Sequence, residues 1–167
     1  MHAFLYDGTQ MIDLGTLGGL NSHAYGINNN GYVVGRSQFR SNNAAYHAFL
    51  YDGANMTDLG TLGGTNSHAE AINDLNQVVG CSLIFGSSDW HAFIYESGNL
   101  LDLNTLIPSD SGWVLERAYD INNSGQIVGF GSINGQTRAF LMTPVPEPTT
   151  LSPVSYTHLR AHETKAN

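Results

Sequence analysis

The stretch HAFLYDGANMTDLGTLGG, residues 47–64, has a near copy at residues 2–19, HAFLYDGTQMIDLGTLGG, and a looser copy at residues 91–106, HAFIYESGNLLDLNTL. A second segment follows each copy and also repeats, as AYGINNNGYVVG, AEAINDLNQVVG and AYDINNSGQIVG, at residues 24–35, 69–80 and 118–129. The chain is therefore a tandem array, and its repeat decides the fold. Three units of 44–47 residues cover 2–46, 47–90 and 91–137, and a partial fourth unit covers 138–143.

Each unit predicts four short strands. The first two are the His-Ala-Phe-Leu-Tyr run and the Met/Leu-x-Asp-Leu run, joined by Asp-Gly, a strong hairpin dipeptide. The last two are Ala-x-x-Ile-Asn and the Val/Ile-Val-Gly run, separated by Asn-rich turns whose residue types tolerate a positive φ. No segment carries a sustained helical period, so the sequence predicts an all-β fold.

Four antiparallel strands in about 45 residues match one blade of a β-propeller. A two-turn β-solenoid coil or an open stack of sheets would also occupy this length. Propellers need about four to eight blades to close, whereas this chain holds about three and a half. We therefore expect a fragment of a longer propeller, with residues 2–14 forming half of a blade that begins upstream. The alternatives are that two chains combine, or that residues 2–14 pair with the incomplete unit at 118–142.

The composition excludes several classes of partner. Only 12% of the residues are charged and the formal net charge is -8, so the chain would repel the phosphates of nucleic acids and anionic membrane surfaces. No stretch approaches the roughly 20 apolar residues of a membrane span. A single cysteine, Cys81, allows no internal disulfide and no cysteine-based metal cluster. Its counterparts in the other units are Arg36 and Phe130, so we interpret Cys81 as a half-buried thiol at a tolerant position.

Two sets of residues recur at the same place in each unit and are candidates for a site. The histidines His2, His47 and His91, with His23 and His68 at a second position, would form a ring of metal ligands in one interpretation. Arg138 and Arg117 replace them in other units, and arginine is not a metal ligand, so we favour hydrogen bonding between blades and predict no metal. The aspartates Asp13, Asp58 and Asp102 are consistent with a calcium site or a glycosidase pair. One identical carboxylate per unit is more typical of an architectural hydrogen bond.

Other motifs predict no chemistry. The Asn-rich turns at 27–31, 72–76 and 121–125 contain too few carboxylates for a calcium loop. The Gly-Thr-Leu-Gly-Gly segments at 15–19 and 60–64 precede no lysine and no helix, so they are not phosphate loops. We find no cofactor motif and no catalytic set, and we predict that the protein is not an enzyme.

The segments that depart from the repeat are where binding residues are expected, because loops can vary without disturbing the core. The departures at 37–46, 83–90 and 108–116 bring aromatic side chains that are candidates for a ligand face: Phe39, Phe85, Trp90 and Trp113. The alternative is that the two tryptophans fill gaps between blades.

Residues 2–143 resemble the HAF-repeat family of extracellular bacterial proteins, through the His-Ala-Phe triplets, the Asp-Leu-Gly-Thr-Leu-Gly-Gly segments and the Ile-Asn-x-x-Gly-x-Val-Val-Gly segments. This resemblance implies a secreted or surface-attached repeat domain and supplies no catalytic residues. The following VPEPT, residues 145–149, resembles the Pro-Glu-Pro motif of PEP-CTERM sorting tails of bacteria that make exopolysaccharide, although the apolar helix of that family is absent here.

We therefore expect three parts: the repeat domain at 1–143, a Pro-rich linker at 144–151, and a disordered tail at 152–167. The tail resembles translated adapter sequence and is expected not to be native; we assign no function to its His158, His162 and Glu163. The sequence favours a secreted or cell-surface module for binding or scaffolding, with a glycan or a protein as partner. We expect this module to bind neither a metal nor a cofactor. The alternative is a fragment of a carbohydrate-active propeller enzyme.

Overall fold

The computed structural model describes residues 1–40 and 45–144, and the backbone of 159–162. All of its sheets are antiparallel. The strands are β1 (Phe4–Tyr6), β2 (Met11–Asp13), β3 (Gly18–Ile27), β4 (Val33–Phe39), β5 (Tyr46–Tyr51), β6 (Met56–Gly60), β7 (Gly63–Ile72), β8 (Val78–Ile84), β9 (Trp90–Glu96), β10 (Asn99–Asp102), β11 (Trp113–Ile121), β12 (Ile127–Ile133), β13 (Gln136–Pro144) and β14 (Leu159–His162). Within the described ranges the one helical segment is a 3-10 turn, η1 (Leu103–Leu106). The all-β prediction is confirmed.

The strands form one two-stranded sheet, β1-β2, and three four-stranded sheets, β3-β4-β5-β6, β7-β8-β9-β10 and β11-β12-β13-β14. We name them the leading hairpin and sheets 1, 2 and 3. Sheets 1 and 2 each take their first two strands from one sequence unit and their last two from the next. Sheet 3 takes β11 and β12 from the unit at 91–137 and adds β13 and the tail strand β14. The units at 2–46, 47–90 and 91–137 are thus offset by half a unit from the sheets.

The sheets stack face to face in chain order, and an apolar layer fills each interface. The leading hairpin contributes Ala3 and Leu14 against Val33 and Phe49 of sheet 1. The next layer joins sheet 1 to sheet 2 and contains Val34, Ala48, Leu59, Ala69, Ile72, Val78 and Phe93. The third joins sheet 2 to sheet 3 and contains Val79, Ile94, Leu103, Leu115, Ile121, Ile127, Phe140 and Met142 among its members.

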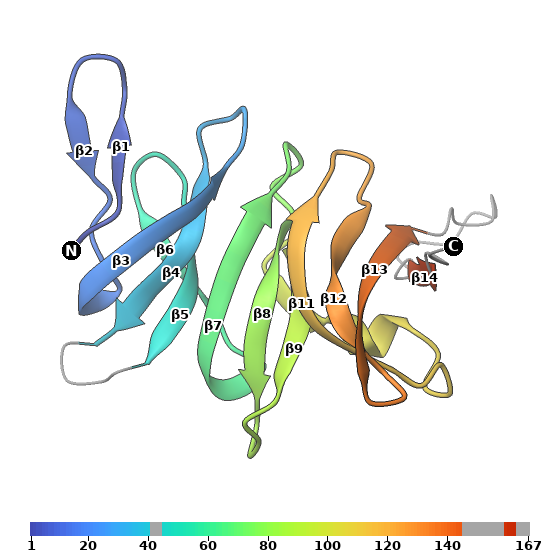
Figure 1. Cartoon of the computed structure of the whole chain (residues 1–167). Helices are drawn as coiled ribbons and strands as arrows, with labels where there is room; N and C mark the ends of the chain where they lie inside the picture. Colours follow the sequence, from blue (N-terminus) through green and yellow to red (C-terminus); the bar gives the residue numbers. More distant parts are fainter. Residues whose placement is uncertain (41–44, 145–158, 163–167) are drawn as a thin grey trace.

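The described sheets form an open row, with the leading hairpin at one end and β13 at the other (Figure 1). Four-stranded antiparallel sheets are what the sequence predicts, and closure into a propeller stays a prediction. The expectation that residues 2–14 pair with the unit at 118–142 does not hold, because β1 and β2 form a separate sheet and β13 pairs with β12 and β14.

The tail differs from its prediction at one point. Leu159–His162 pairs with β13 as strand β14, so four residues of the tail expected to be disordered are part of a sheet. The remainder of the tail and residues 145–151 of the linker, including the VPEPT motif, lie outside the described residues. No helix in the described part of the chain has the length and apolar character needed to cross a membrane.

The turns between the third and fourth strands use asparagine as expected. In the first turn the Asn28 side chain accepts hydrogen bonds from the backbone N–H groups of Asn30 and Tyr32. It also donates to the backbone carbonyl of Asn73 in the next sheet at 3.0 Å, and Asn73 donates to Asn122 at 3.0 Å. The asparagine turns therefore also connect successive sheets, which the sequence alone does not indicate.

Candidate functional site

The first recurring set of histidines bonds to the recurring aspartates within a single hairpin. The Nδ1 atoms of His2, His47 and His91 lie 2.8, 2.9 and 2.6 Å from an oxygen of Asp13, Asp58 and Asp102. The expectation of a bond between blades is therefore wrong for these three histidines, since each pair spans two adjacent strands of one sheet. The reason is the register, which places the first and second strands of a unit side by side.

Each aspartate also shapes the loop that follows it. Asp13 accepts from the backbone N–H of Gly15, Asp58 from Gly60, and Asp102 from Asn104, all at 2.8 Å. Burial raises the pKa of Asp58, but the bonds from His47 and from the Gly60 N–H outweigh burial and hold the pKa below its ordinary value. These contacts give the aspartates the architectural role expected of a residue present once per unit.

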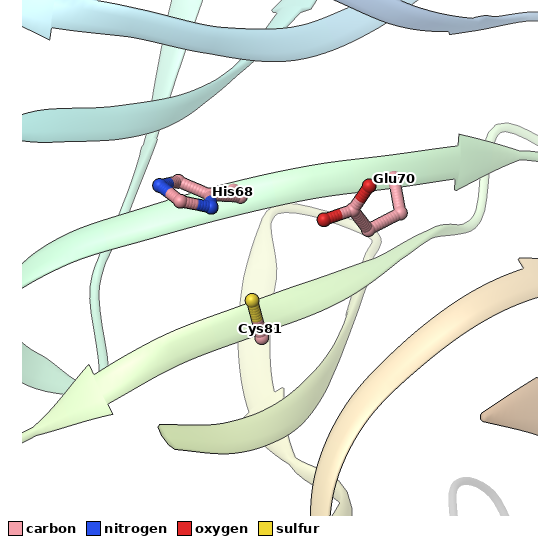
Figure 2. A group of neighbouring side chains, drawn as sticks. All are labelled: His68, Glu70 and Cys81. Carbon is pink, nitrogen blue, oxygen red and sulfur yellow. The ribbon is translucent and has the colours of Figure 1, made fainter. Parts of the chain in front are cut away.

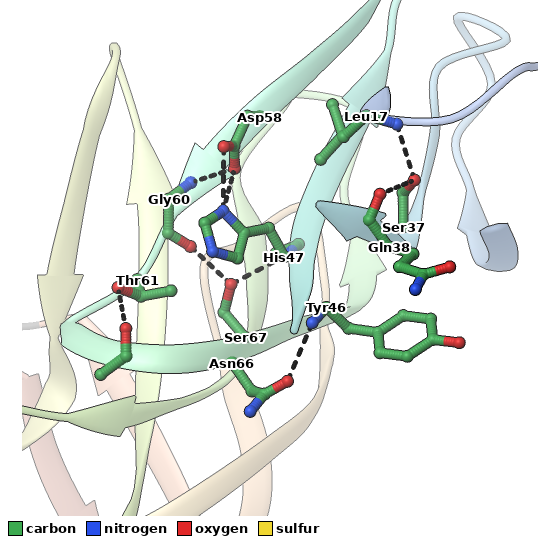
Figure 3. A network of polar contacts seen from close by, with 12 residues as sticks. Leu17, Ser37, Gln38, Tyr46, His47, Asp58, Gly60, Thr61, Asn66 and Ser67 are labelled. Carbon is green, nitrogen blue, oxygen red and sulfur yellow. Dashed lines mark hydrogen bonds and ion pairs between the residues drawn. The ribbon is translucent and has the colours of Figure 1, made fainter. Parts of the chain in front are cut away.

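Hydrogen bonds between sheets come from serines that sequence reasoning missed. The Ser67 hydroxyl on β7 accepts from the Ala48 N–H of sheet 1 at 2.9 Å and donates to the Gly60 carbonyl (Figure 3). Ser22 does the same toward the leading hairpin, with Ala3 and Gly15 as partners. The available signal was the tetrapeptide Asn-Ser-His-Ala, which occurs identically at 21–24 and 66–69.

The second recurring position has a different environment. In each four-stranded sheet it faces a cross-strand partner on the neighbouring strand, and the pairs are His23 with Arg36, His68 with Cys81, and Arg117 with Phe130. The geometry is the same three times, but the chemistry differs each time. Here the expected contact between blades is present, because Arg36 of sheet 1 and Arg117 of sheet 3 both reach His68 of sheet 2.

His68 lies between two guanidinium groups. Arg36 Nη1 is 3.3 Å from His68 Nε2, and Arg117 Nη2 is 3.3 Å from His68 Nδ1. Burial, with the charges of Arg36 and Arg117, lowers the pKa of His68 from 6.5 to about 4. The ring is therefore neutral near pH 7. A neutral imidazole accepts through one nitrogen only, so one of the two arginines faces an N–H rather than an acceptor.

Arg117 is the centre of this group. Its guanidinium bonds to Glu70 at 3.1 Å, and its Nε lies 3.3 Å from the Cys81 sulfur. Burial raises the pKa of the Cys81 thiol to about 11, so the sulfur is protonated. Only 1% of Cys81 is exposed, which corrects the interpretation of a half-buried thiol. We name Arg36, His68, Glu70, Cys81 and Arg117 the arginine cluster.

Three members of the arginine cluster have donor atoms suited to a metal. His68 and Glu70 on β7 and Cys81 on β8 have ligand atoms within 4.8 Å of one another (Figure 2). The Arg117 guanidinium already contacts all three side chains, and a metal would need the thiolate form of Cys81. The positively charged guanidinium of Arg117 therefore occupies the position that a metal cation would need among His68, Glu70 and Cys81.

A cavity of about 250 Å³ opens beside the arginine cluster between sheets 2 and 3, lined by Cys81, Trp90, Glu116, Arg117 and Phe130. The Trp90 ring packs against His68, with ring centres 5.0 Å apart and a tilt of 44°. Every lining residue differs in type from its counterparts in the other units; the position of Trp90, for example, is Tyr46 in the preceding unit. The cavity is therefore specific to one interface of the array.

The four predicted aromatic residues do not form one face. Trp90 lines the cavity. Phe39 instead stacks on His47 at 4.3 Å, Phe85 is 86% exposed, and Trp113 packs on the apolar layer between sheets 2 and 3. A role for Trp90 in ligand binding stays a prediction. The sequence did not indicate that Arg117, Glu116 and Phe130, from a distant part of the chain, line the same cavity.

The model of a family described as a protein of unknown function, DUF3466, matches residues 18–118, which is 101 of the 167 residues. The chain belongs to this family. The match begins with β3 and ends within β11, so it contains sheets 1 and 2 and every member of the arginine cluster. No curated protein and no solved structure matches the DUF3466 chain significantly.

Proposed function

We propose that the protein is a non-catalytic binding module, and that the cavity beside the arginine cluster is its binding site. The observation that supports this proposal is the distribution of side chains over the repeat. The His–Asp pairs that order the loops are identical in three hairpins, whereas the cross-strand pair at the second recurring position is His23–Arg36, His68–Cys81 or Arg117–Phe130. Selection for the fold alone would not require a different pair in each sheet.

The chemistry of the cavity suits a saccharide. Trp90 and Phe130 offer apolar ring faces for the C–H face of a sugar, and Arg117 and Glu116 offer a donor and an acceptor for hydroxyl groups. The volume of about 250 Å³ lies just below the roughly 300–1,000 Å³ of typical small-molecule sites, so one sugar ring fits rather than a long oligosaccharide.

We further propose that the module acts outside the cell or on its surface. The His-Ala-Phe repeats resemble extracellular bacterial proteins, and VPEPT at 145–149 resembles the sorting motif of exopolysaccharide-producing bacteria. A surface module that binds one sugar ring per site would serve as a scaffold within an exopolysaccharide matrix or biofilm.

The second candidate is a fragment of a carbohydrate-active propeller enzyme, which the presence of Glu116 in the cavity favours. Glycoside hydrolysis needs a pair of carboxyl groups. Among the described residues that line the cavity, Glu116 is the one carboxylate, and the nearby Glu70 is already bound by Arg117. The binding module therefore agrees better with the geometry.

The two tryptophans make a direct test possible. In a Trp113→Phe variant, Trp90 is the single remaining tryptophan, and its emission reports on the cavity. We expect titration with neutral and acidic polysaccharide fragments to shift this emission for at least one of them, and Arg117→Met to weaken the response about tenfold or more. Release of reducing ends from the bound fragment, abolished by Glu116→Gln, would instead favour the enzyme. No response to any fragment would refute the saccharide proposal.

A further inference from the structure

The end of the row at the leading hairpin has an exposed apolar face. Six large apolar side chains on β1, β2 and β3 are 45–65% exposed: Phe4, Tyr6, Met11, Leu20, Tyr25 and Ile27. A groove of about 280 Å³ lies among them, lined by Phe4–Tyr6, Ala24–Ile27 and Val33. It is far in the row from the cavity between sheets 2 and 3, which has other lining residues.

The repeat shows what fills this position elsewhere. Ile27 is 58% exposed, but its counterparts Ile72 and Ile121 are only 8% and 4% exposed. Ile72 is buried in the layer that contains Val34 of the preceding sheet, and Ile121 in the layer that contains Val79. Val34 and Val79 are equivalent residues of the fourth strand of a unit, and both are completely buried. The groove therefore lacks the valine-bearing strand that covers it at both inner interfaces.

Strand β1 also lacks one of the two neighbouring strands that its counterparts in sheets 1 and 2 have. Its counterparts β5 and β9 each pair on both sides, with β4 and β6 and with β8 and β10. Among the described strands, β1 pairs with β2 only. At the inner interfaces, the strand that pairs with β5 or β9 also carries the buried valine: β4 carries Val34 and β8 carries Val79. One added hairpin would therefore both pair with β1 and cover the groove.

We propose that this groove and the open edge of β1 bind a β-hairpin of the repeat's own kind, with the pattern Ile-Asn-x-x-Gly-x-Val-Val-Gly. The hairpin adds two strands to the leading hairpin, which makes a four-stranded sheet, and its second valine packs against Ile27. This is strand addition to a sheet edge, in which backbone hydrogen bonds give affinity and side-chain pockets give specificity. The site is independent of the saccharide proposal.

The probe is a synthetic peptide with the sequence of residues 63–84, which forms β7 and β8, carrying Cys81→Ser to prevent oxidation. We expect calorimetric binding to the full chain, with protection of the Phe4–Tyr6 amides from hydrogen exchange. Ile27→Asn in the protein, or Val79→Asn in the peptide, should each weaken binding at least about tenfold, which is about 1.4 kcal/mol. Leu75→Asn, an exposed position in a distant turn, is the matched control and should leave the affinity unchanged.

An isolated hairpin is only marginally stable, so a second measurement covers a peptide that binds too weakly to detect. Joining the same 22-residue sequence to the N-terminus through a flexible linker raises its effective concentration. We then expect an increased Tm that Ile27→Asn abolishes. An unchanged Tm would overturn the proposal. Self-association of the unmodified chain that Val128→Asn removes would also overturn it, because the face of sheet 3 from a second copy would then be the occupant.

Discussion

Two kinds of hairpin carry different polar pairs. The leading hairpin and the last two strands of sheets 1 and 2 carry a His–Asp pair, and this pair is the same at His2–Asp13, His47–Asp58 and His91–Asp102. The first two strands of each four-stranded sheet carry a cross-strand pair at one fixed place, and this pair is different each time: His23–Arg36, His68–Cys81 and Arg117–Phe130.

The difference reflects two structural requirements. A His–Asp pair closes a hairpin and orders the loop after it, so each of these three hairpins keeps the same two residues. The pairs on the first two strands lie where one sheet meets the next, and their neighbours include other variable positions. A Cβ on Gly80 would overlap the carbonyl oxygen of His68, so the backbone there is held tightly while the side chains vary. Identical residues therefore mark the framework, and different residues on the same framework mark the site.

The largest effect is expected at a framework serine. Ser67→Ala removes the partner of the Ala48 N–H and of the Gly60 carbonyl. Ala48 and Ser67 are completely buried, and Gly60 is partly buried. Leaving a buried N–H and a partly buried carbonyl unpaired should lower the free energy of unfolding by about 2–4 kcal/mol. Urea unfolding measures this loss. Ser88→Ala, on an exposed loop, is the control and should change little; equal losses in both variants would remove the distinction between framework and surface.

A smaller loss is expected when a His–Asp pair is broken. Asp58→Ala deletes the bonds to His47 and to the Gly60 N–H and should cost about 1–2 kcal/mol in urea unfolding. Asp13 makes the same two bonds in the leading hairpin, but its side chain is 64% exposed against 29% for Asp58. We therefore expect a smaller loss for Asp13→Ala. If the Asp13 variant lost as much, burial would not be the factor that sets the strength of these pairs.

The arginine cluster should produce its own pH dependence. The pKa of His68 is about 4 in the folded chain and 6.5 when unperturbed, so the unfolded state binds the proton more readily. The free energy of unfolding should fall as the pH drops from about 6.5 toward 4 and should stop falling from this cause below that range. The lowered pKa of Asp58 adds a loss only at lower pH, near the ordinary aspartate value. Unfolding at a series of pH values, with His68→Gln as the control, separates the two; an unaltered slope in that variant would contradict the assignment.

The smallest effect on stability is expected for Arg36→Met. The Nε–H of Arg36 is buried without a hydrogen-bond partner, and its charge opposes protonation of His68. Replacing it with an apolar side chain of similar length should change the free energy of unfolding by less than about 1 kcal/mol. The pKa of His68, followed by NMR, should nevertheless rise. A pKa that stays near 4 would show that burial and the charge of Arg117 lower it without Arg36.

The repeat and its turns could be predicted from the sequence because both are local. Asp-Gly and Asn-rich turns between short apolar runs specify hairpins, and the four-strand count per unit follows. The half-unit offset is expected from the sequence only for residues 2–14, as half of a blade, since a repeating sequence does not show where the later sheets end and begin. That choice depends on whether β4 pairs with β5, a contact between units that the spacing does not encode.

The same limit explains what was missed at the site. The difference between Cys81, Arg36 and Phe130 was visible, but a position with three unlike residues was interpreted as tolerant. The structure places all three next to another variable residue at the junction of two sheets. Arg117 and Glu116 lie 36 and 35 residues after Cys81 in the chain, and only the stacking of sheets 2 and 3 brings them to one cavity.

The half-unit offset also governs how such an array can change in length. Because sheets 1 and 2 each take one strand pair from each of two consecutive units, duplication or loss of one whole unit within this part of the array leaves each internal strand with a partner of the correct kind. Unit-sized recombination events therefore alter the number of layers and create unpaired edges only at the two ends. An array of this design can be extended or shortened genetically. Each new interface between sheets then contains its own cross-strand pair, which can vary independently of the others.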